Sequence, residues 1–372
     1  MSVETSARRV RSIVVDLGER SYPVHVGRGI SERAGELIRQ GLPEVRICAV
    51  VTSEGIHEAH GRPLIESLED LDILVGLALV PDGEEAKTWG AAGDLVGDLL
   101  EAGLDRRSAV IAFGGGTIGD LAGFVASVYM RGVGLVQVPT TLLAQVDSSI
   151  GGKAAVNHPR GKNLIGAFHQ PSVVISDQGL LRTLPRRELL SGLGEVVKHG
   201  VIADPMLFEL AESQGERLIK ADPDALEEAV VRSVAIKSRL VERDERDNKG
   251  SRVILNYGHT LGHTLETLSG HDLRHGEAVA LGMEFAASLA VEAGTFKARE
   301  AERQTRALKE LGFKLGPPSA DPLELVAAMR LDKKAVGSTI NFVLPMGIGS
   351  TPILRPVSED RIIHALEEAG YG

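Results

Sequence analysis

The first half of the chain alternates short apolar runs with longer stretches of helical period. The runs are rich in β-branched residues and cover 11–18, 45–51, 71–80, 108–116, 134–141 and 172–177. Short apolar runs separated by amphipathic helical stretches are typical of strands joined by crossover helices. This half therefore predicts an α/β domain with a parallel, Rossmann-like sheet.

The second half carries a different pattern. After about Leu184 the strand-like runs almost vanish, and long amphipathic stretches follow, for example at 223–245 and 275–294. Proline and charge around Pro185 interrupt both patterns, which marks a boundary there. We expect an α/β domain over residues 1–184 and a mainly helical domain over residues 185–372. A late apolar run at 339–345 is expected to form a hairpin strand.

Composition narrows the possible partners. The formal net charge is −10 and aromatic residues make up 3% of the chain, so a surface for nucleic acid or for an anionic membrane is not expected. Cys48 is the only cysteine and stands in an apolar run, which favours a buried thiol in a reducing compartment. The N-terminus lacks the apolar segment of a signal peptide, and Glu284 interrupts the most apolar later stretch. We expect a cytoplasmic protein.

A glycine-rich turn follows the run at 108–113 directly. It comprises Gly114, Gly115, Gly116, Thr117, Ile118, Gly119 and Asp120. At a strand-to-helix turn, glycines let backbone N–H groups face a pyrophosphate, and the helix N-terminus favours negative charge. The spacing is not a strict G-x-G-x-x-G, so nucleotide binding and an ordinary tight turn both remain open.

A second glycine-rich element, at 137–163, is dense in polar side chains. Asp147, Lys153, Asn157, Lys162 and Asn163 lie within it. Lysines beside glycines and asparagines suit phosphate, hydroxyl and carboxylate recognition, whereas a solvated loop is the alternative.

Five of the eleven histidines fall between His199 and His275. His259 and His263 are four residues apart and so share one face of a helix, and His271 and His275 repeat that spacing. Histidines together with a carboxylate, for which Glu195 is a candidate, form a common Zn²⁺ site. This pattern leaves the identity of the ligands open.

Basic side chains accompany the histidines. They are Lys198, Lys237, Arg252, Lys333 and Lys334. These residues could be unrelated surface charges. Their occurrence together with a candidate metal site and a candidate dinucleotide turn instead favours binding of an anionic, phosphorylated substrate.

Taken together, these segments resemble the 3-dehydroquinate synthase family, in the superfamily of sugar phosphate cyclases. The matching pieces are PDGEEAK, FGGGTIGDLAGFVASVYMRG, the element at 137–171, SGLGEVVKHG, RVILNYGHTLGHTLE, HGEAVALGM and RLDKK. They follow the family order from about residue 82 to residue 334. Differences from the common family pattern occur at Ala154, Gly194, His199 and in the segment 51–55.

The resemblance implies an active site in the cleft between the two domains, with NAD and a divalent metal, Zn or Co, as cofactors. It makes Glu195, His259 and His275 the metal ligands and leaves His263 for the substrate. It also implies a homodimer in which Arg131 enters the neighbouring subunit's site. The implied cofactor contacts are Asp82, Gly83, Glu84, Glu85, Ala86, Lys87, Gly114 to Asp120, Thr140, Thr141, Lys153, Lys162, Leu180, Leu181, Arg182 and Thr183. The implied substrate contacts are Asp147, Lys153, Asn163, Lys198, Lys237, Arg252, Asn256, Lys333 and Lys334.

The implied reaction converts 3-deoxy-D-arabino-heptulosonate 7-phosphate into 3-dehydroquinate and phosphate. It combines transient oxidation by NAD, phosphate elimination, reduction, ring opening and an intramolecular aldol closure. His263 is a candidate for proton transfer, because an imidazole titrates near neutral pH. The alternatives are a related cyclase acting on an amino analogue or a neutral sugar phosphate, a metal-dependent polyol dehydrogenase, and a non-catalytic binding protein. Arg252 is a good partner for a substrate carboxylate, which favours the dehydroquinate branch.

Overall fold

A computed structural model describes residues 10–270, 272–316, 318–332 and 338–372 of the chain. The chain divides into two compact units. The first contains Met1–Leu184 and Leu226–Arg246, and the second contains Pro185–Ala225 and Asp247–Gly372. The sequence pattern assigned all of 185–372 to one helical domain, so Leu226–Arg246 is where the structure differs.

The first unit is built on a seven-stranded sheet with the order β1-β2-β9-β6-β5-β3-β4. Every neighbouring pair is parallel except β1 and β2. These two are joined by a short 3-10 turn at Gly18–Arg20, and so short a connection requires antiparallel pairing. The predicted Rossmann-like α/β domain is thus confirmed. Its strands are β1 (Arg11–Val15), β2 (Tyr22–Gly27), β3 (Ile47–Thr52), β4 (Leu74–Leu79), β5 (Ala109–Gly114), β6 (Gly134–Pro139) and β9 (Val173–Asp177).

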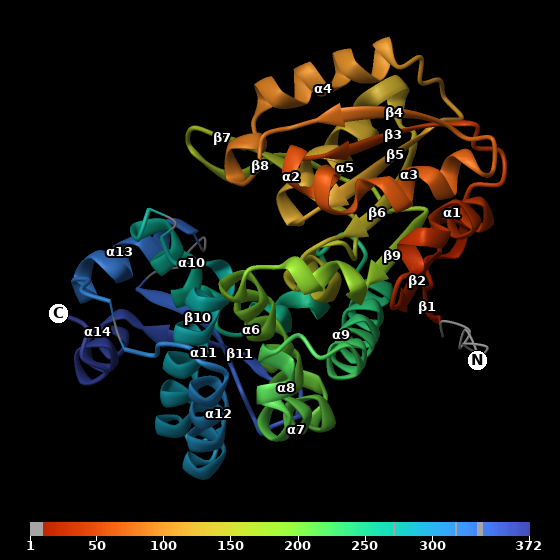
Figure 1. The fold of residues 1–372 in the computed structure, drawn as a ribbon. Helices are drawn as coiled ribbons and strands as arrows, with labels where there is room; N and C mark the ends of the chain where they lie inside the picture. Colours follow the sequence, from red (N-terminus) through yellow and green to blue (C-terminus); the bar gives the residue numbers. More distant parts are fainter. Residues whose placement is uncertain (1–9, 271, 317, 333–337) are drawn as a thin grey trace, which may run out of the picture. The chain divides into compact units, whose positions relative to one another are not determined.

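Helices cover both faces of this sheet (Figure 1). Helices α1 (Ala34–Gly41) and α3 (Arg62–Glu69) pack on the face that contains Val50 and Ile111. Helices α4 (Trp89–Glu101) and α5 (Gly116–Val128) pack on the face that contains Val51 and Val110. Successive strand residues point to opposite faces, so a strand buried on both sides must be apolar throughout. This explains the uninterrupted apolar runs of the sequence.

Helix α9 (Pro223–Arg243) contributes most of its length to the first unit. The Arg11 guanidinium lies 3.2 Å from Glu227 and 2.8 Å from Glu228, and Arg20 lies 2.7 Å from Glu245 just beyond the helix. These contacts join segments more than two hundred residues apart, which is why a local pattern did not predict them.

A small hairpin completes the first unit. It consists of β7 (Lys153–His158) and β8 (Gly161–Phe168), which pair antiparallel, and it contacts α5. The glycine-rich element at 137–163 therefore ends in a hairpin rather than in an open loop.

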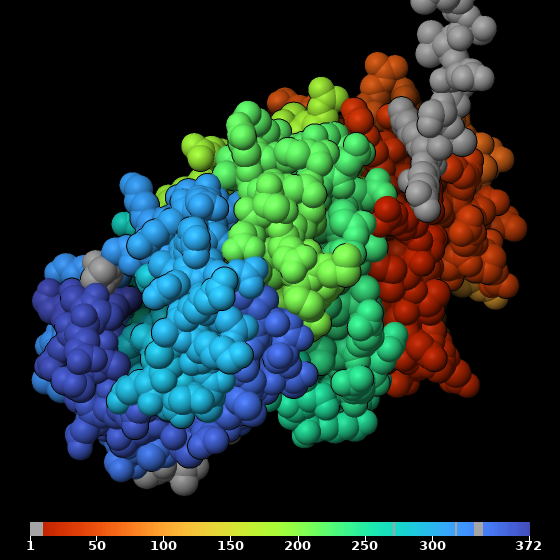
Figure 2. Space-filling model, turned by 90° about the horizontal axis from the view of Figure 1, so that it is seen from below, coloured from red at the N-terminus to blue at the C-terminus, as the bar shows by residue number. Residues whose placement is uncertain are grey.

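The second unit is mainly helical, as predicted. The expected late strand β10 (Thr339–Leu344) pairs with β11 (Ile353–Ser358), and both contribute to a core that they share with α10, α11, α13 and α14. Figure 2 shows α12 in light blue against the light green of α7 and α8. The helices are α6 (Arg186–Ala203), α7 (Pro205–Ser213), α8 (Gly215–Ile219), α10 (His259–Leu268), α11 (His275–Glu292), α12 (Ala298–Leu311), α13 (Pro322–Asp332) and α14 (Glu359–Glu368). Among the described residues, none of the helices has both the length and the apolarity needed to cross a membrane.

Candidate functional site

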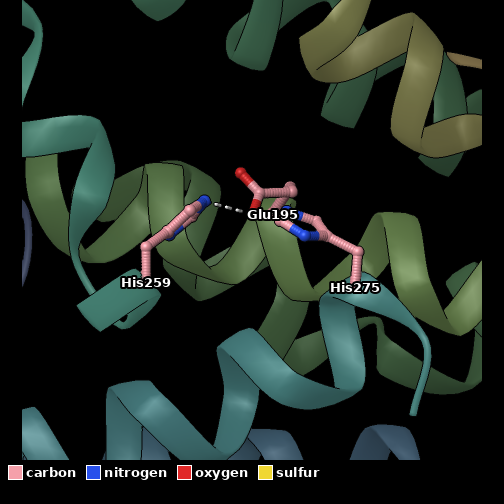
Figure 3. Close-up of side chains that lie close together, drawn as sticks. All are labelled: Glu195, His259 and His275. Carbon is pink, nitrogen blue, oxygen red and sulfur yellow. Dashed lines mark ion pairs between the residues drawn. The ribbon is translucent and has the colours of Figure 1, made fainter. Parts of the chain in front are cut away.

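Three helix segments of the second unit bring Glu195, His259 and His275 together (Figure 3). Glu195 lies in the middle of α6, while His259 and His275 are the first residues of α10 and α11. One donor atom from each side chain lies within 4.8 Å of the other two. The three residues are separated by up to eighty positions in the sequence, so only the packing of the helices makes them neighbours.

The spacing of these donor atoms fits a shared cation. The Glu195 Oε1 atom lies 3.4 Å from His275 Nε2 and 3.7 Å from His259 Nε2. Ligand bonds of about 2.1 Å in a tetrahedral zinc site place neighbouring donor atoms roughly 3.4 Å apart. Glu195 is fully buried and needs a compensating charge, which Lys198 supplies on the Oε2 side, while Oε1 faces the two histidines. Three protein donors also leave a coordination position for another ligand.

The second nitrogen of each imidazole is already engaged. His259 Nδ1 lies 3.1 Å from the Tyr257 carbonyl oxygen, and His275 Nδ1 lies 3.3 Å from Glu266 Oε2. Since both partners only accept hydrogen bonds, the Nδ1 atoms must donate. When both rings are neutral, as metal binding requires, the Nε2 lone pairs face Glu195, which is the arrangement that metal-binding histidines use. The sequence pattern did not single out Glu266 as a site residue. Its spacing of seven residues from His259, which places both on one helix face, was the available signal.

Charges are concentrated around this cluster. Lys198, which is almost fully buried, forms an ion pair with Glu195 one turn earlier on α6. Burial alone would raise the pKa of Glu195, but Lys198 and the two histidines hold it well below its usual range. Burial, with help from Lys198, lowers the pKa of His259 well below its usual value. Burial opposes charging of His275, yet Glu195 and Glu266 together raise its pKa to about 9.

His263 lies beside the three residues but outside the set. Its ring centroid is 5.0 Å from that of His259 and 6.0 Å from that of His275. His263 lies one turn after His259 on α10, so the two histidines share one face of the helix, as their spacing predicted. His275, in contrast, begins a separate helix, and His271 lies outside the described residues.

The remaining substrate candidates of this unit are Arg252 and Asn256. Both belong to a 3-10 turn at Ser251–Asn256, which leads through Tyr257 and Gly258 into α10. Arg252 is 4% exposed, so its guanidinium is largely removed from water. Lys333 and Lys334 lie outside the described residues.

In the first unit, the glycine-rich turn joins a strand directly to the N-terminus of a helix. Strand β5 ends at Gly114, Gly115 is the N-cap and α5 begins at Gly116. A Cβ atom on Gly115 would lie 3.1 Å from Thr141 Cγ2, and one on Gly116 would lie 2.9 Å from Ser148 Oγ. Glycine thus allows this turn to approach its neighbours closely. Thr117 to Asp120 form the first turns of α5, and Thr140 follows β6, where its N–H donates to Gly114 O at 3.0 Å.

This turn also lies where sheets of this kind bind ligands. The strand that follows β3 in the chain, β4, lies on one side of it, whereas the strand that follows β5, β6, lies on the opposite side. The order in which strands are added to the sheet therefore reverses between β3 and β5. In open parallel sheets, ligands bind at the carboxyl ends of the strands at such a switch point.

The segment Asp82–Lys87 is tied to the same turn through Glu84 and Lys87. Lys87 Nζ lies 2.5 Å from Asp120 Oδ2, and burial raises the pKa of Asp120 against the effect of that lysine. Glu84 accepts from Asn157 Nδ2 at 2.6 Å and lies 3.5 Å from Thr117 Oγ1. The other members, Asp82, Gly83 and Glu85, are exposed, and Ala86 is buried.

The remaining first-unit candidates lie on several elements. Lys237 on α9 forms an ion pair with Asp147, and its Nζ also donates to the Asp147 carbonyl at 2.6 Å. Leu180, Leu181, Arg182 and Thr183 form a 3-10 segment after β9, in which both leucines are buried. His60, which the sequence did not single out, lies 2.7 Å from Thr183 Oγ1. Lys153, Lys162 and Asn163 lie on the β7–β8 hairpin, and Lys162 Nζ lies 4.0 Å from Glu84.

Arg131 stands in an unusual backbone conformation just after α5. It is exposed and has φ = 70°, and the preceding Met130 has φ = 48°. Consecutive non-glycine residues with positive φ are costly and cluster at functional sites.

Comparison with known proteins gives consistent matches along the chain. The family described as 3-dehydroquinate synthase N-terminal matches residues 77–191, and the family described as 3-dehydroquinate synthase C-terminal matches residues 192–335. The 3-dehydroquinate synthase of Pelotomaculum thermopropionicum is 46% identical over 98% of both chains. That of Symbiobacterium thermophilum is 46% identical over 95% of this chain and 99% of its own.

Solved structures share the fold. A 2-deoxy-scyllo-inosose synthase in complex with carbaglucose-6-phosphate, NAD⁺ and Co²⁺ matches with a TM-score of 0.87 and 27% identity, over 96% of this chain and 99% of its own. A 2-epi-5-epi-valiolone synthase from Streptomyces hygroscopicus with NAD⁺ and Zn²⁺ matches with a TM-score of 0.86 and 27% identity, over 95% and 98%. A sulfoacetaldehyde reductase from Bifidobacterium kashiwanohense, at 15% identity and a TM-score of 0.69, shares the fold alone.

Proposed function

Because this chain belongs to the 3-dehydroquinate synthase family, we propose that it converts 3-deoxy-D-arabino-heptulosonate 7-phosphate into 3-dehydroquinate and inorganic phosphate. The reaction is a lyase step of the shikimate pathway, which leads to the aromatic amino acids. The convergence of Glu195, His259 and His275 is the structural observation that carries this proposal, because the chemistry needs a metal site open to substrate. We also propose a cytoplasmic location, because a single buried and unpaired cysteine, Cys48, suits a reducing compartment.

We assign Glu195, His259 and His275 as ligands of a divalent metal, Zn or Co, and the turn at 114–120 with its neighbours as the NAD site. The donor spacing near 3.4 Å and the engaged Nδ1 atoms support the metal assignment. The glycine turn at the carboxyl end of β5 supports the NAD assignment. Bound metal supplies Lewis acidity at a substrate hydroxyl, and bound NAD supplies reversible hydride acceptance.

The basic side chains hold the anionic groups of the substrate. Arg252 has a planar guanidinium suited to a carboxylate, and its burial strengthens such a pair. Lys198 and Lys237 are also buried, and each already contacts a carboxylate, Glu195 and Asp147 respectively. We assign these lysines to the substrate oxygens and the departing phosphate. The further assigned contacts are Lys153, Asn163, Asn256, Lys333 and Lys334.

His263 is assigned to proton transfer at the substrate oxygen nearest the metal ligands. It lies one helical turn from His259, with ring centroids 5.0 Å apart. An imidazole can act as a general acid or base toward a bound substrate.

We also propose a homodimer in which Arg131 completes the partner's site. The constrained backbone at Met130 and Arg131, together with the exposure of Arg131, supports this role. The test mixes two inactive variants, Arg131→Ala and His263→Ala, by refolding them together. Shared sites predict that activity returns in the mixed dimer, because one of its sites has both residues. Failure to regain activity while mixed dimers form would contradict a shared site.

The decisive assay uses the purified protein loaded with Zn²⁺ or Co²⁺ and NAD. Phosphate, NADH absorbance and the carbocyclic product are followed together after adding the heptulosonate phosphate. We expect phosphate and product in equal amounts with no net NADH. Accumulating NADH would indicate a polyol dehydrogenase, and turnover only with the amino analogue or with a neutral sugar phosphate would indicate a related cyclase.

A further inference from the structure

Helices α6 and α11 touch through backbone at the point where they carry two of the assigned ligands. Gly276 follows His275, and a Cβ atom on it would lie 1.9 Å from the Ser191 carbonyl oxygen. Gly194 precedes Glu195, and a Cβ atom on it would lie 2.7 Å from the Gly276 carbonyl oxygen. Because backbone atoms cannot give way as a flexible side chain can, the two helices approach this closely only with glycine at the contact.

The contact between α10 and α11 is built in the same way. Gly258 precedes the third ligand, His259, and has φ = 80°. A Cβ atom on Gly282 of α11 would lie 1.8 Å from the Gly258 carbonyl oxygen. Each of the three ligands therefore has a glycine as its sequence neighbour, and each of these glycines lies at a contact between the helices.

A buried hydrogen bond also links α6 to α11. The Gly276 N–H donates to the Ser191 hydroxyl at 3.0 Å, and Ser191 is 2% exposed. Ser191 lies one helical turn before Glu195, while Gly276 adjoins His275. This hydrogen bond therefore connects a side chain near Glu195 on α6 to the backbone beside His275 on α11.

Exposed ion pairs form an outer link between the same helices. Arg187 on α6 lies 2.7 Å from Glu277 on α11, and Arg274 lies 2.7 Å from Glu188. Both arginine side chains are about half exposed, so each pair is expected to contribute little. The buried contact at Ser191 and Gly276 is the stronger constraint.

We propose that Ser191 and Gly276 are positioning residues that set the distance between Glu195 and His275, and thereby the affinity and geometry of the metal site. The inference rests on the metal assignment made under the proposed function. The Glu195 Oε1 to His275 Nε2 distance of 3.4 Å matches the separation of two donors on one zinc ion. A shift of a few tenths of an ångström between α6 and α11 would be transmitted to both donors.

The test compares three full-length variants with the wild-type protein. Ser191→Ala removes the hydroxyl that accepts from Gly276 and leaves the volume almost unchanged. Gly276→Ala forces the helices apart. Ser288→Ala is the control for loss of a serine hydroxyl from α11: Ser288 is exposed, and its hydroxyl donates within its own helix, to Phe285 O at 2.7 Å. Zn²⁺ affinity is measured by chelator competition, Co²⁺ geometry by visible absorption and folding by circular dichroism.

We expect Ser191→Ala to fold like the control, to bind Zn²⁺ about 10-fold more weakly and to show an altered Co²⁺ spectrum, as is typical when an outer partner of a ligand is lost. Gly276→Ala should bind Zn²⁺ more weakly still. If Gly276→Ala does not fold, the result for Ser191→Ala alone tests the proposal. Wild-type affinity and spectrum in Ser191→Ala would overturn the inference while leaving the proposed function intact. Absence of metal binding in the wild-type protein would instead overturn the metal assignment itself.

Discussion

Replacing His259 or His263 with alanine tests whether His259 is a metal ligand and His263 is not. Both residues lie on α10, four positions apart, with ring centroids 5.0 Å from each other. His259 Nε2 lies 3.7 Å from Glu195 Oε1, whereas His263 is outside the set of three donors. The two substitutions remove the same side chain from the same helix, so each serves as the control for the other.

The expected magnitude follows from the number of donors. A structural zinc site with four protein ligands binds with roughly 10–16 kcal/mol, which is about 3 kcal/mol per ligand. Since 1.4 kcal/mol is about tenfold in an equilibrium constant, His259→Ala should weaken Zn²⁺ binding by about two orders of magnitude. His263→Ala should keep the wild-type affinity. It should lose turnover by about 10²- to 10⁴-fold, the usual contribution of a general acid or base.

The assay measures zinc by elemental analysis after dialysis and affinity by chelator competition, with turnover followed as phosphate release. Circular dichroism checks that both variants fold. A His263→Ala protein that loses its metal would show that the ligand set is wrongly assigned. A His259→Ala protein that keeps full affinity would refute the reasoning from donor spacing.

Three further outcomes test other parts of the molecule. Arg252→Met should raise KM for the substrate by about 10²-fold without changing NAD binding, because a buried charge pair is worth about 2 to 5 kcal/mol. Gly116→Val should weaken NAD binding in a fluorescence titration, since even a Cβ atom there would lie 2.9 Å from Ser148 Oγ. Burial raises the pKa of the Cys48 thiol to about 12, so at pH 8 the thiolate is scarce and a thiol reagent should react only after denaturation.

Much of the fold follows from local pattern. The six apolar runs of the first half all became strands, because a strand covered on both faces must be apolar along its whole length. The strand β2 was missed, since Pro23 interrupts its pattern and its alternation is weak. The β7–β8 hairpin was also missed, although the turn residues at 159–161 between two alternating stretches were a usable signal.

Some features of the candidate site also follow from local sequence, whereas others depend on the tertiary structure. The sequence by itself determined which side chains are present, the strand-turn-helix at Gly114–Gly116 and the spacing of His259 and His263, because strand and helix periods are local properties. Only the tertiary structure decided that the donor atoms of Glu195, His259 and His275 lie close together and that the Leu226–Arg246 segment belongs to the first unit. Such contacts join residues far apart in the chain, and they depend on how closely helix backbones can approach. That distance is set by packing at a few glycines and cannot be read from the period of any single element.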